Sequence, residues 1–180
     1  MKDYNVLEYI TSDDLKNFRN KLNMTQKEFA KLIGVSKPTL ERWETSKNII
    51  TGPIVLMIDL LSDNIELLEK REIPEKKYPF RLWYIYKNKK CTLIDVDDIN
   101  QKIWTKDYVN NIMFRAFGAN RNPTYDDYEA FLKSRCFPET RDKMKIQLDA
   151  LGIPFYDPML IIKKTQGRMA EDDFWILIER

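Results

Sequence analysis

The fold of this chain is decided by residues 24–47, which read MTQKEFAKLIGVSKPTLERWETSK. Thr25 and Glu28 form a Thr-x-x-Glu pattern, which is typical of the start of a helix because each side chain can bond a free backbone amide there. Gly34 follows the apolar residues of that helix and suits the left-handed position at which helices often end. Ser36 then favours the start of a second helix, because its hydroxyl can accept from the first backbone amides. The stretch therefore predicts two short helices joined by a tight turn.

Helical segments on both sides extend this region. Upstream, Ser12 is expected to cap a helix whose apolar residues stand at helical spacing, namely Leu15, Phe18 and Leu22. Downstream, Gly52-Pro53 opens a further helix, with Thr51 as its expected cap, and the residues that follow are apolar on nearly every side. Two short helices around a glycine turn make a helix-turn-helix. The sequence therefore predicts an all-α helix-turn-helix domain over residues 1–72.

Residues 24–47 resemble the DNA-binding helix-turn-helix of the Cro/cI type, the XRE family. The stretch GPIVLMIDLLSDNIELLEK at residues 52–70 is similar to the closing helices of antitoxin-type regulators in that family, and the whole resemblance spans roughly residues 12–72. It implies binding of double-stranded DNA, with the second helix of the pair in the major groove and the N-terminal residues of that helix at base edges.

Ten residues are expected at the DNA on this basis: Gln26, Lys27, Ser36, Lys37, Pro38, Thr39, Glu41, Arg42, Thr45 and Lys47. The resemblance places Lys37, Pro38 and Arg42 against bases, and Arg42 is best suited to a bidentate bond with guanine. Pro38 has no donor and can offer only apolar contact. Gln26 begins the preceding helix, where amide groups can grip a phosphate, whereas Lys27 adds an attraction that does not depend on base sequence.

The distribution of charge agrees with a DNA-binding segment. The whole chain carries a net charge of only +2, but residues 15–52 hold eight Lys and Arg against three acids. Residues 53–75 hold two basic and six acidic residues. A basic segment next to an acidic one favours one face for a polyanion and another face for a different partner.

The apolar residues after Pro53 are more numerous than a small helical domain can bury. DNA-binding proteins of this kind commonly act as two-fold dimers on palindromic half-sites. We therefore expect a homodimer whose contact uses part of this apolar surface.

The second half of the chain is expected to be a separate α+β domain. Residues 73–79, with a proline and a charge cluster, are expected to be a linker. Alternating apolar runs then predict a hairpin and a third strand, at residues 80–86, 91–96 and 99–104. Helical spacing predicts four helices and a last strand, at residues 106–118, 124–132, 138–152, 157–167 and 173–178. This order predicts a small, mostly antiparallel sheet with four helices over residues 80–180.

Composition excludes several kinds of chemistry. The chain has no histidine and only two cysteines, Cys91 and Cys136, without the spacing of a metal site. Histidine-based acid–base catalysis and Cys-rich zinc sites are therefore excluded. The acids Asp95, Asp97 and Asp98 could bind a divalent metal through oxygens, but they also fit a turn after a strand, which we favour. We expect no metal, no cofactor, no catalytic residue and no enzyme activity.

No apolar run approaches the length of about 20 residues that a membrane helix needs, and the mean hydropathy is −0.52. The first residues also lack the apolar segment of a secretory signal. We therefore expect a cytoplasmic protein without a membrane partner.

Three functions are consistent with these patterns. The first is a sequence-specific, DNA-binding transcriptional regulator and repressor, with residues 80–180 as an interaction domain for a protein or a small ligand. The second is an antitoxin that regulates its own operon and neutralises a toxin or kinase through that domain. The stretch from Phe131 to Trp175 is weakly similar to small bacterial proteins that accompany HipA-like kinases. The third is a DNA-acting enzyme with a metal-dependent second domain.

Overall fold

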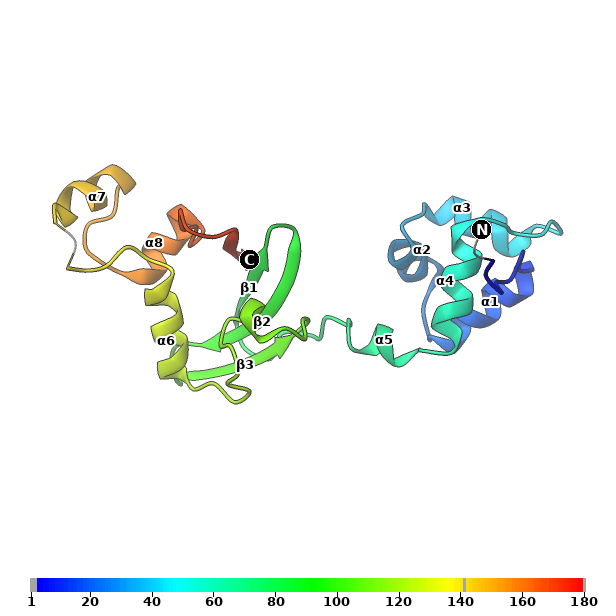
Figure 1. Ribbon diagram of the computed structural model, residues 1–180, viewed down its shortest axis with the longest axis horizontal. Helices are drawn as coiled ribbons and strands as arrows, with labels where there is room; N and C mark the ends of the chain where they lie inside the picture. The colour runs from blue at the N-terminus through cyan, green and yellow to red at the C-terminus, as the bar shows by residue number, and fades with distance from the viewer. Residues whose placement is uncertain (1–2, 141, 180) are drawn as a thin grey trace. The chain divides into compact units, whose positions relative to one another are not determined.

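A computed structural model describes residues 3–140 and 142–179 of the chain. The chain divides into two compact units, residues 1–72 and 73–180 (Figure 1). Residues 73–79, which the sequence predicts as a linker, therefore group with the second unit. Among the described residues, no helix is both long and apolar enough to cross a membrane.

The first unit consists of short helices, namely α1 (Ser12–Lys21), α2 (Gln26–Ile33), α3 (Lys37–Thr45), α4 (Pro53–Ser62) and α5 (Glu66–Glu69). The predicted cap of α2 is confirmed: the Thr25 hydroxyl accepts from the Glu28 amide, and the Glu28 carboxylate accepts from the Thr25 amide. Gly34 ends α2 in the left-handed region, with φ 73°, and Ser36 caps α3, as predicted. The helix-turn-helix is therefore built by local sequence signals.

Two predicted caps in this unit are wrong. Thr11 caps α1, because its hydroxyl accepts from the Asp14 amide while Asp14 bonds back to the Thr11 amide. The hydroxyl of Ser12 instead donates to the carbonyl of Ser46, so it ties α1 to the end of α3. At the start of α4, Gly52 and not its preceding threonine takes the cap position, with φ 97°, a conformation that glycine adopts at little cost.

One apolar core holds the first unit together. Its buried residues come from the helices and from two flanking segments, and they are Ile10, Leu15, Phe18, Phe29, Ala30, Leu40, Ile50, Val55 and Ile58. Leu40 and Trp43 pack toward this core from α3. Ile10 and Ile50 also pair through their backbones, which joins the segment before α1 to the segment before α4. The core therefore fixes the position of α3 relative to α1 and α2.

The second unit is a four-stranded antiparallel sheet with helices. Its strands are β1 (Phe80–Tyr86), β2 (Lys89–Asp97), β3 (Lys102–Asp107) and β4 (Phe174–Glu179), in the order β3-β2-β1-β4. The predicted hairpin is confirmed: β1 pairs with β2 around a turn at Lys87, whose φ is 53°. The last strand returns to lie beside β1, as the sequence predicts.

The helices of the second unit differ from the prediction of four. Its described residues form α6 (Tyr125–Ser134), α7 (Met144–Leu151), α8 (Pro158–Thr165) and a 3₁₀ turn, η1 (Ile112–Phe114). The helix predicted at residues 106–118 is absent from this described segment. β3 continues to Asp107, and the guanidinium of Arg115 then donates to the carbonyls of Val109 and Asn110, so side-chain bonds replace helical ones there.

The helix predicted from residue 138 begins only at Met144. Lys143, directly before it, has a left-handed φ of 61°, which interrupts any helix from further upstream. Position 141, inside the predicted helix, lies outside the described residues. The predicted C-terminal end of this helix at Gly152 is confirmed.

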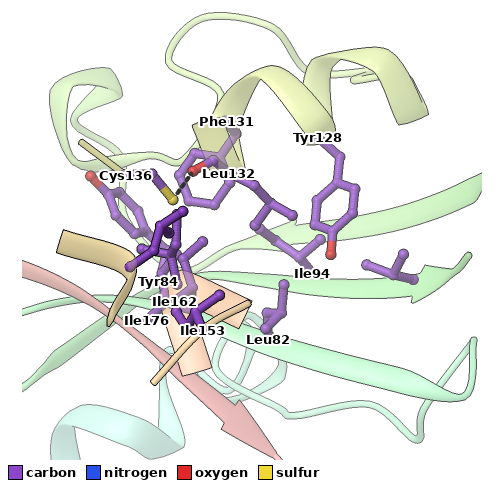
Figure 2. Close-up of a cluster of buried hydrophobic side chains, with 13 residues drawn as sticks. Leu82, Tyr84, Ile94, Tyr128, Phe131, Leu132, Cys136, Ile153, Ile162 and Ile176 are labelled. Carbon is purple, nitrogen blue, oxygen red and sulfur yellow. Dashed lines mark hydrogen bonds between the residues drawn. The ribbon is translucent and has the colours of Figure 1, made fainter. Parts of the chain in front are cut away.

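Both faces of the sheet are apolar. One face packs against α6 and α8 in the larger core, which Figure 2 shows with Leu82, Tyr84, Ile94 and Ile176 on strands and Tyr128, Phe131 and Leu132 on α6. The opposite face carries a smaller cluster of Trp83, Ile85 and Leu93, with Trp104, Tyr108 and Trp175 packed against it. The sheet is therefore the centre of the second unit.

Candidate nucleic-acid interface

The ten residues that the sequence predicts at the DNA lie on two elements, the start of α2 and the outer side of α3 with the loop that follows it. Seven of them are exposed, namely Lys27, Ser36, Lys37, Pro38, Arg42, Thr45 and Lys47, and three are half-buried, namely Gln26, Thr39 and Glu41. Leu40, on the opposite side of α3, is fully buried. The core thus holds one side of α3, and the predicted contact residues occupy the side that remains open.

The first turn of α3 is organised by hydroxyl groups. The Ser36 hydroxyl accepts from the Thr39 amide at 3.2 Å, and the two hydroxyl oxygens lie 2.8 Å apart. Pro38 stands between them in the first turn, where a missing amide proton costs nothing. Ser36 and Thr39 therefore fix where α3 begins, and their bonding capacity is partly used within the protein.

Lys37 and Glu41 pair with each other along α3. Lys37 Nζ lies 2.7 Å from Glu41 Oε1, and the two side chains are 52% and 42% exposed. An exposed pair of this kind contributes at most about 1 kcal/mol, so a phosphate or a base can compete for the lysine. Arg42 forms no ion pair within the described residues, which leaves its guanidinium available for a guanine edge.

The end of α3 continues the same open surface. The Thr45 hydroxyl donates to the carbonyl of Glu41 at 2.8 Å, so it is engaged within the helix. Lys47 is exposed in the following loop. Arg42 borders a shallow hollow with this loop, which is lined by Trp43, Ser46, Asn48, Ile49, Ile50 and Thr51. The guanidinium of Arg42 therefore stands at the edge of this hollow.

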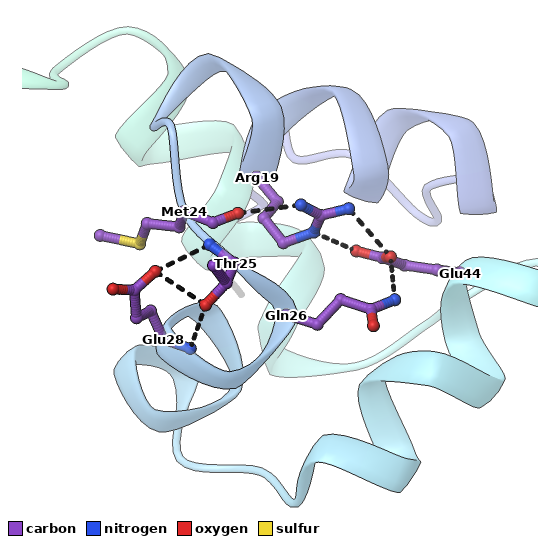
Figure 3. A network of polar contacts seen from close by, with 6 residues as sticks. All are labelled: Arg19, Met24, Thr25, Gln26, Glu28 and Glu44. Carbon is purple, nitrogen blue, oxygen red and sulfur yellow. Dashed lines mark hydrogen bonds and ion pairs between the residues drawn. The ribbon is translucent and has the colours of Figure 1, made fainter.

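A polar network under this surface joins the first three helices (Figure 3). The guanidinium of Arg19 on α1 binds Glu44 on α3 in a bidentate manner, at 2.6 and 3.1 Å. Gln26 on α2 donates its amide to the same carboxylate at 2.8 Å, and Arg19 also donates to the carbonyl of Met24. The side chain of Glu44 is only 3% exposed. Each of these three helices therefore supplies one side chain of the network.

The electrostatics of Glu44 follow from these contacts. Burial by itself raises the pKa of Glu44, but the hydrogen bonds from Arg19 and Gln26 and the positive charge of Arg19 outweigh burial and hold the pKa below its usual range. The carboxylate is therefore ionised in the folded state and favours the fold over the unfolded chain.

This lowered pKa gives a prediction about acid stability. Glu44 adds to the free energy of unfolding at every pH above its unfolded pKa of 4.5. This stabilisation is lost as the pH falls through the lower pKa of the folded state. We expect the free energy of unfolding of the first unit to fall below about pH 4.5, and to fall less in a Glu44→Gln variant. Amide hydrogen exchange of peptides from residues 12–62 across a pH series measures this, and equal acid sensitivity of both proteins would contradict it.

Sequence reasoning missed this network. Arg19 stands four residues after Leu15, at the same helical spacing as the apolar residues of its helix, and the sequence predicts no partner for it. For Gln26 the sequence predicts a phosphate contact. A signal was available, because a charged residue within an apolar helical stripe needs a buried partner. In the structure the Gln26 side chain donates to Glu44. The backbone amides at the start of α2 belong to the first turn of a helix, where amides have no partner within the helix.

The acids for which a metal site was the alternative to a turn, Asp95, Asp97 and Asp98, do not form a metal site with a third acid or cysteine in the described residues. Asp95 is buried against Arg81, with bonds of 2.6 and 2.8 Å. Asp97 accepts from the amides of Ile99 and Asn100 and from the Asn100 side chain, so the turn interpretation is confirmed for this residue. Within residues 3–140 and 142–179, no three Cys, Asp or Glu side chains are placed to hold a metal ion.

Comparison with known proteins agrees with this geometry for the first unit. Residues 15–58 match the model of the family described as Helix-turn-helix. A curated relative, Antitoxin HigA-2 of Vibrio cholerae, is 32% identical over 59 residues, which cover 33% of this chain and 57% of the relative. The chain therefore spans little more than half the length of the curated relative it matches. Residues 15–58 therefore form a helix-turn-helix domain of the XRE type.

Proposed function

We propose that this protein is a cytoplasmic, sequence-specific DNA-binding regulator that represses transcription and is not an enzyme. The observation that carries the proposal is the two-sided nature of α3: Leu40 anchors one side in the core while Arg42 and Lys37 stand on the exposed side. The second unit would serve as the domain that binds a protein or a small ligand. A helix presented in this way suits the major groove, which is wide enough to admit it.

Binding to DNA across a salt series tests this proposal. The probe is labelled duplex from the region upstream of the protein's own gene, with scrambled duplex of equal length as the control, and fluorescence anisotropy as the measurement. We expect tight binding to the upstream duplex, weaker binding to the scrambled one, and affinity for both that falls as salt rises. Equal affinity for the two duplexes would contradict sequence-specific autoregulation.

Arg42→Ala is expected to weaken binding to the preferred duplex by about 1–3 kcal/mol, or about 5- to 150-fold, and to relax base preference at one position. The reason is loss of a bidentate bond to a base edge. The matched control is Lys27→Ala, which removes a phosphate-type attraction and should weaken specific and scrambled duplex alike, with the salt slope lowered by about one. Unchanged affinity of Arg42→Ala for the preferred duplex would remove Arg42 from the interface.

A second candidate function is that of an antitoxin. It is supported by the relative named Antitoxin HigA-2, whose similarity lies within 59 residues of this chain. In this function the protein regulates its own operon, and the second unit neutralises a toxin or kinase. Co-expression with the product of the neighbouring gene tests it: growth arrest that is relieved by the full chain, and not by residues 1–72, supports the antitoxin function.

We further propose that the protein acts as a homodimer. Two leucines of α4, Leu56 and Leu60, are exposed, as is Leu67 on α5, while Val55 and Ile58 face the core. Leu60→Glu should give a monomer by light scattering and lower the affinity for a two-fold DNA site, because it places a charge in the apolar contact. Ile146→Glu on α7 is the control, since Ile146 is exposed to a similar degree (59% against 57%) in the other unit. Equal masses for wild type and Leu60→Glu would contradict this contact.

A further inference from the structure

The helices of the second unit pack against one face of its sheet. The cluster on the opposite face is formed by residues of the strands and by Tyr108, which follows β3. Residues 74–77 cross one end of this opposite face, where they bond to Arg81 and Asp95. We call the other end, beside the turn of β1 and β2, the open face, and strand pairing places on it Trp83, Ile85, Lys90, Trp175 and Leu177.

Trp175 provides an aromatic ring on the open face that is both held in place and partly accessible. The residue is half-buried, and its indole nitrogen donates to the carbonyl of Lys87 at 2.8 Å. The guanidinium of Arg168, an exposed residue, lies 4.9 Å from the centre of the ring. Aromatic rings and guanidinium planes are the surfaces on which proteins stack unpaired bases. Because the ring is already held by a hydrogen bond, stacking on it costs little side-chain entropy.

Lys90 provides a cation next to this ring. Its ammonium nitrogen lies 4.0 Å from the centre of the Trp83 ring. Trp83 is only 1% exposed, so it supports the lysine from below and does not itself contact a ligand. Lys90 is exposed, and neither Lys90 nor Arg168 forms an ion pair within residues 3–140 and 142–179. An exposed lysine is held only weakly by a ring, so a phosphate can compete for it.

The charge of this side of the sheet favours an anion. The carboxylates that its strands carry already have partners: Asp95 binds Arg81, Asp97 accepts from Asn100, and Glu179 accepts from the indole of Trp83. Glu171 borders a small hollow together with Arg168 and offsets part of its charge. Lys90 and Arg168 together still leave the open face positive, which attracts a negatively charged partner.

The combination of a ring with cations distinguishes between anionic partners. A single-stranded nucleic acid offers a flat base to the ring and phosphates to the cations, whereas the bases of a duplex are already stacked on one another. An acidic peptide would satisfy Lys90 and Arg168 but would offer nothing flat to Trp175. A second copy of this chain would bring like charges together, because both sides of a two-fold contact are the same surface.

We propose that the open face binds single-stranded nucleic acid, with one base stacked on the layer formed by Trp175 and Arg168 and with Lys90 at a neighbouring phosphate. Base stacking and phosphate contacts are common to DNA and RNA, and the test distinguishes the two. The inference concerns the second unit alone, whereas duplex binding is assigned to α3, so each can fail without the other.

Titration of the full chain, followed by amide NMR shifts, tests the site. The probes are oligothymidylate and oligouridylate of equal length, with polyglutamate of matched charge as the control. We expect saturable shifts at Lys90, Trp175 and Leu177 with the oligonucleotides and not with polyglutamate. Tighter binding of oligouridylate would assign the site to RNA, and tighter binding of oligothymidylate would assign it to DNA. Equal shifts with polyglutamate would indicate a site for acidic peptides and would overturn the proposal.

Variants separate stacking from attraction by charge. Trp175→Leu removes the ring and should weaken oligothymidylate binding about tenfold, whereas Trp175→Phe keeps a ring and should bind nearly as well as wild type. Lys90→Gln should lower the slope of log affinity against log salt by about 0.7. Lys133→Gln is the matched control, since Lys133 is exposed on α6, which covers the other face of the sheet, and it should change neither quantity.

The preferred duplex shows whether the two nucleic-acid sites are distinct. Trp175→Leu should leave affinity for that duplex unchanged, and Arg42→Ala should leave affinity for oligothymidylate unchanged. Lys90→Gln alters an exposed side chain, so its result does not depend on how the sheet tolerates the loss of Trp175. Absence of saturable shifts on the open face, or full oligothymidylate affinity with an unchanged salt slope in both Trp175→Leu and Lys90→Gln, would overturn the proposal.

Discussion

Replacing Glu44 with alanine is expected to lower the free energy of unfolding of the first unit by about 3–5 kcal/mol and to abolish specific DNA binding. The side chain is 3% exposed and receives bonds from Arg19 and Gln26, which belong to different helices. Its removal leaves the guanidinium of Arg19 in a half-buried place without its counter-charge, which costs far more than losing an exposed pair. A loss of this size is comparable with the whole stability of many small domains.

The same helix supplies a matched control for Glu44→Ala. Glu41→Ala breaks the exposed pair with Lys37 and should change stability by less than about 1 kcal/mol. Amide exchange of peptides from residues 12–62, in the full chain, measures both variants while the second unit serves as an internal reference. A loss below 1 kcal/mol in Glu44→Ala would show that the network does not hold the motif together.

A double variant tests whether Glu44→Ala destabilises the first unit because it leaves the charge of Arg19 unpaired. Arg19→Met together with Glu44→Leu removes both charges and keeps apolar volume, so it should be much closer to wild type in stability than either single change. It also frees the Gln26 amide. If stability returns but affinity for DNA does not, the network acts on DNA binding through the position of Gln26.

Asp95→Ala is expected to have an effect of the same size in the second unit, about 3–5 kcal/mol. Asp95 and Arg81 face each other across β2 and β1, with side chains 0% and 4% exposed. Asp95 also accepts from the Lys77 amide at 2.7 Å, and Arg81 donates to the Pro74 carbonyl at 3.0 Å. Without this carboxylate, the buried guanidinium of Arg81 has no counter-charge, and residues 74–77 are released from the sheet.

The test of Asp95→Ala is urea unfolding of the full chain, followed by the fluorescence of Trp83, Trp104 and Trp175 in a background where Trp43 is replaced by phenylalanine. Asp173→Ala is the control, because Asp173 pairs with Lys87 at 3.4 Å on the exposed surface. We expect the midpoint of the control to stay close to that of the parent. An equal midpoint for Asp95→Ala would mean that the pair does not stabilise the sheet.

The segment from residue 73 to 79 illustrates why part of the fold cannot be predicted from the sequence. Its proline and charges are typical of a linker, since nothing within the segment itself can form a core. The bonds that hold it come from Asp95 and Arg81, which lie several residues away along the chain. Partners supplied by a distant strand are not visible in local patterns.

The helix predicted at residues 106–118 does not form, and here too the reason is bonding to residues that lie further away along the chain. The apolar residues there have helical spacing, but β3 pairs with β2 as far as Asp107, and Thr92 and Arg115 supply bonds to the backbone that follows. Pairing with a neighbouring strand outweighs a weak local preference. The same competition does not arise in the first unit, whose described residues, 3–72, form no strand.

The sequence by itself determined the helix-turn-helix. The capping box at Thr25, the left-handed Gly34 and the Ser36 cap each act within four residues, so their physics is complete in the local sequence. The exposed side of α3 followed from the same periodicity. Only the tertiary structure decided the Arg19–Glu44–Gln26 network, the burial of Arg81 with Asp95, and the bond that holds Trp175 to the turn at Lys87. Each depends on groups that are distant along the chain, whose charges and bonds acquire their strength only when folding removes them from water.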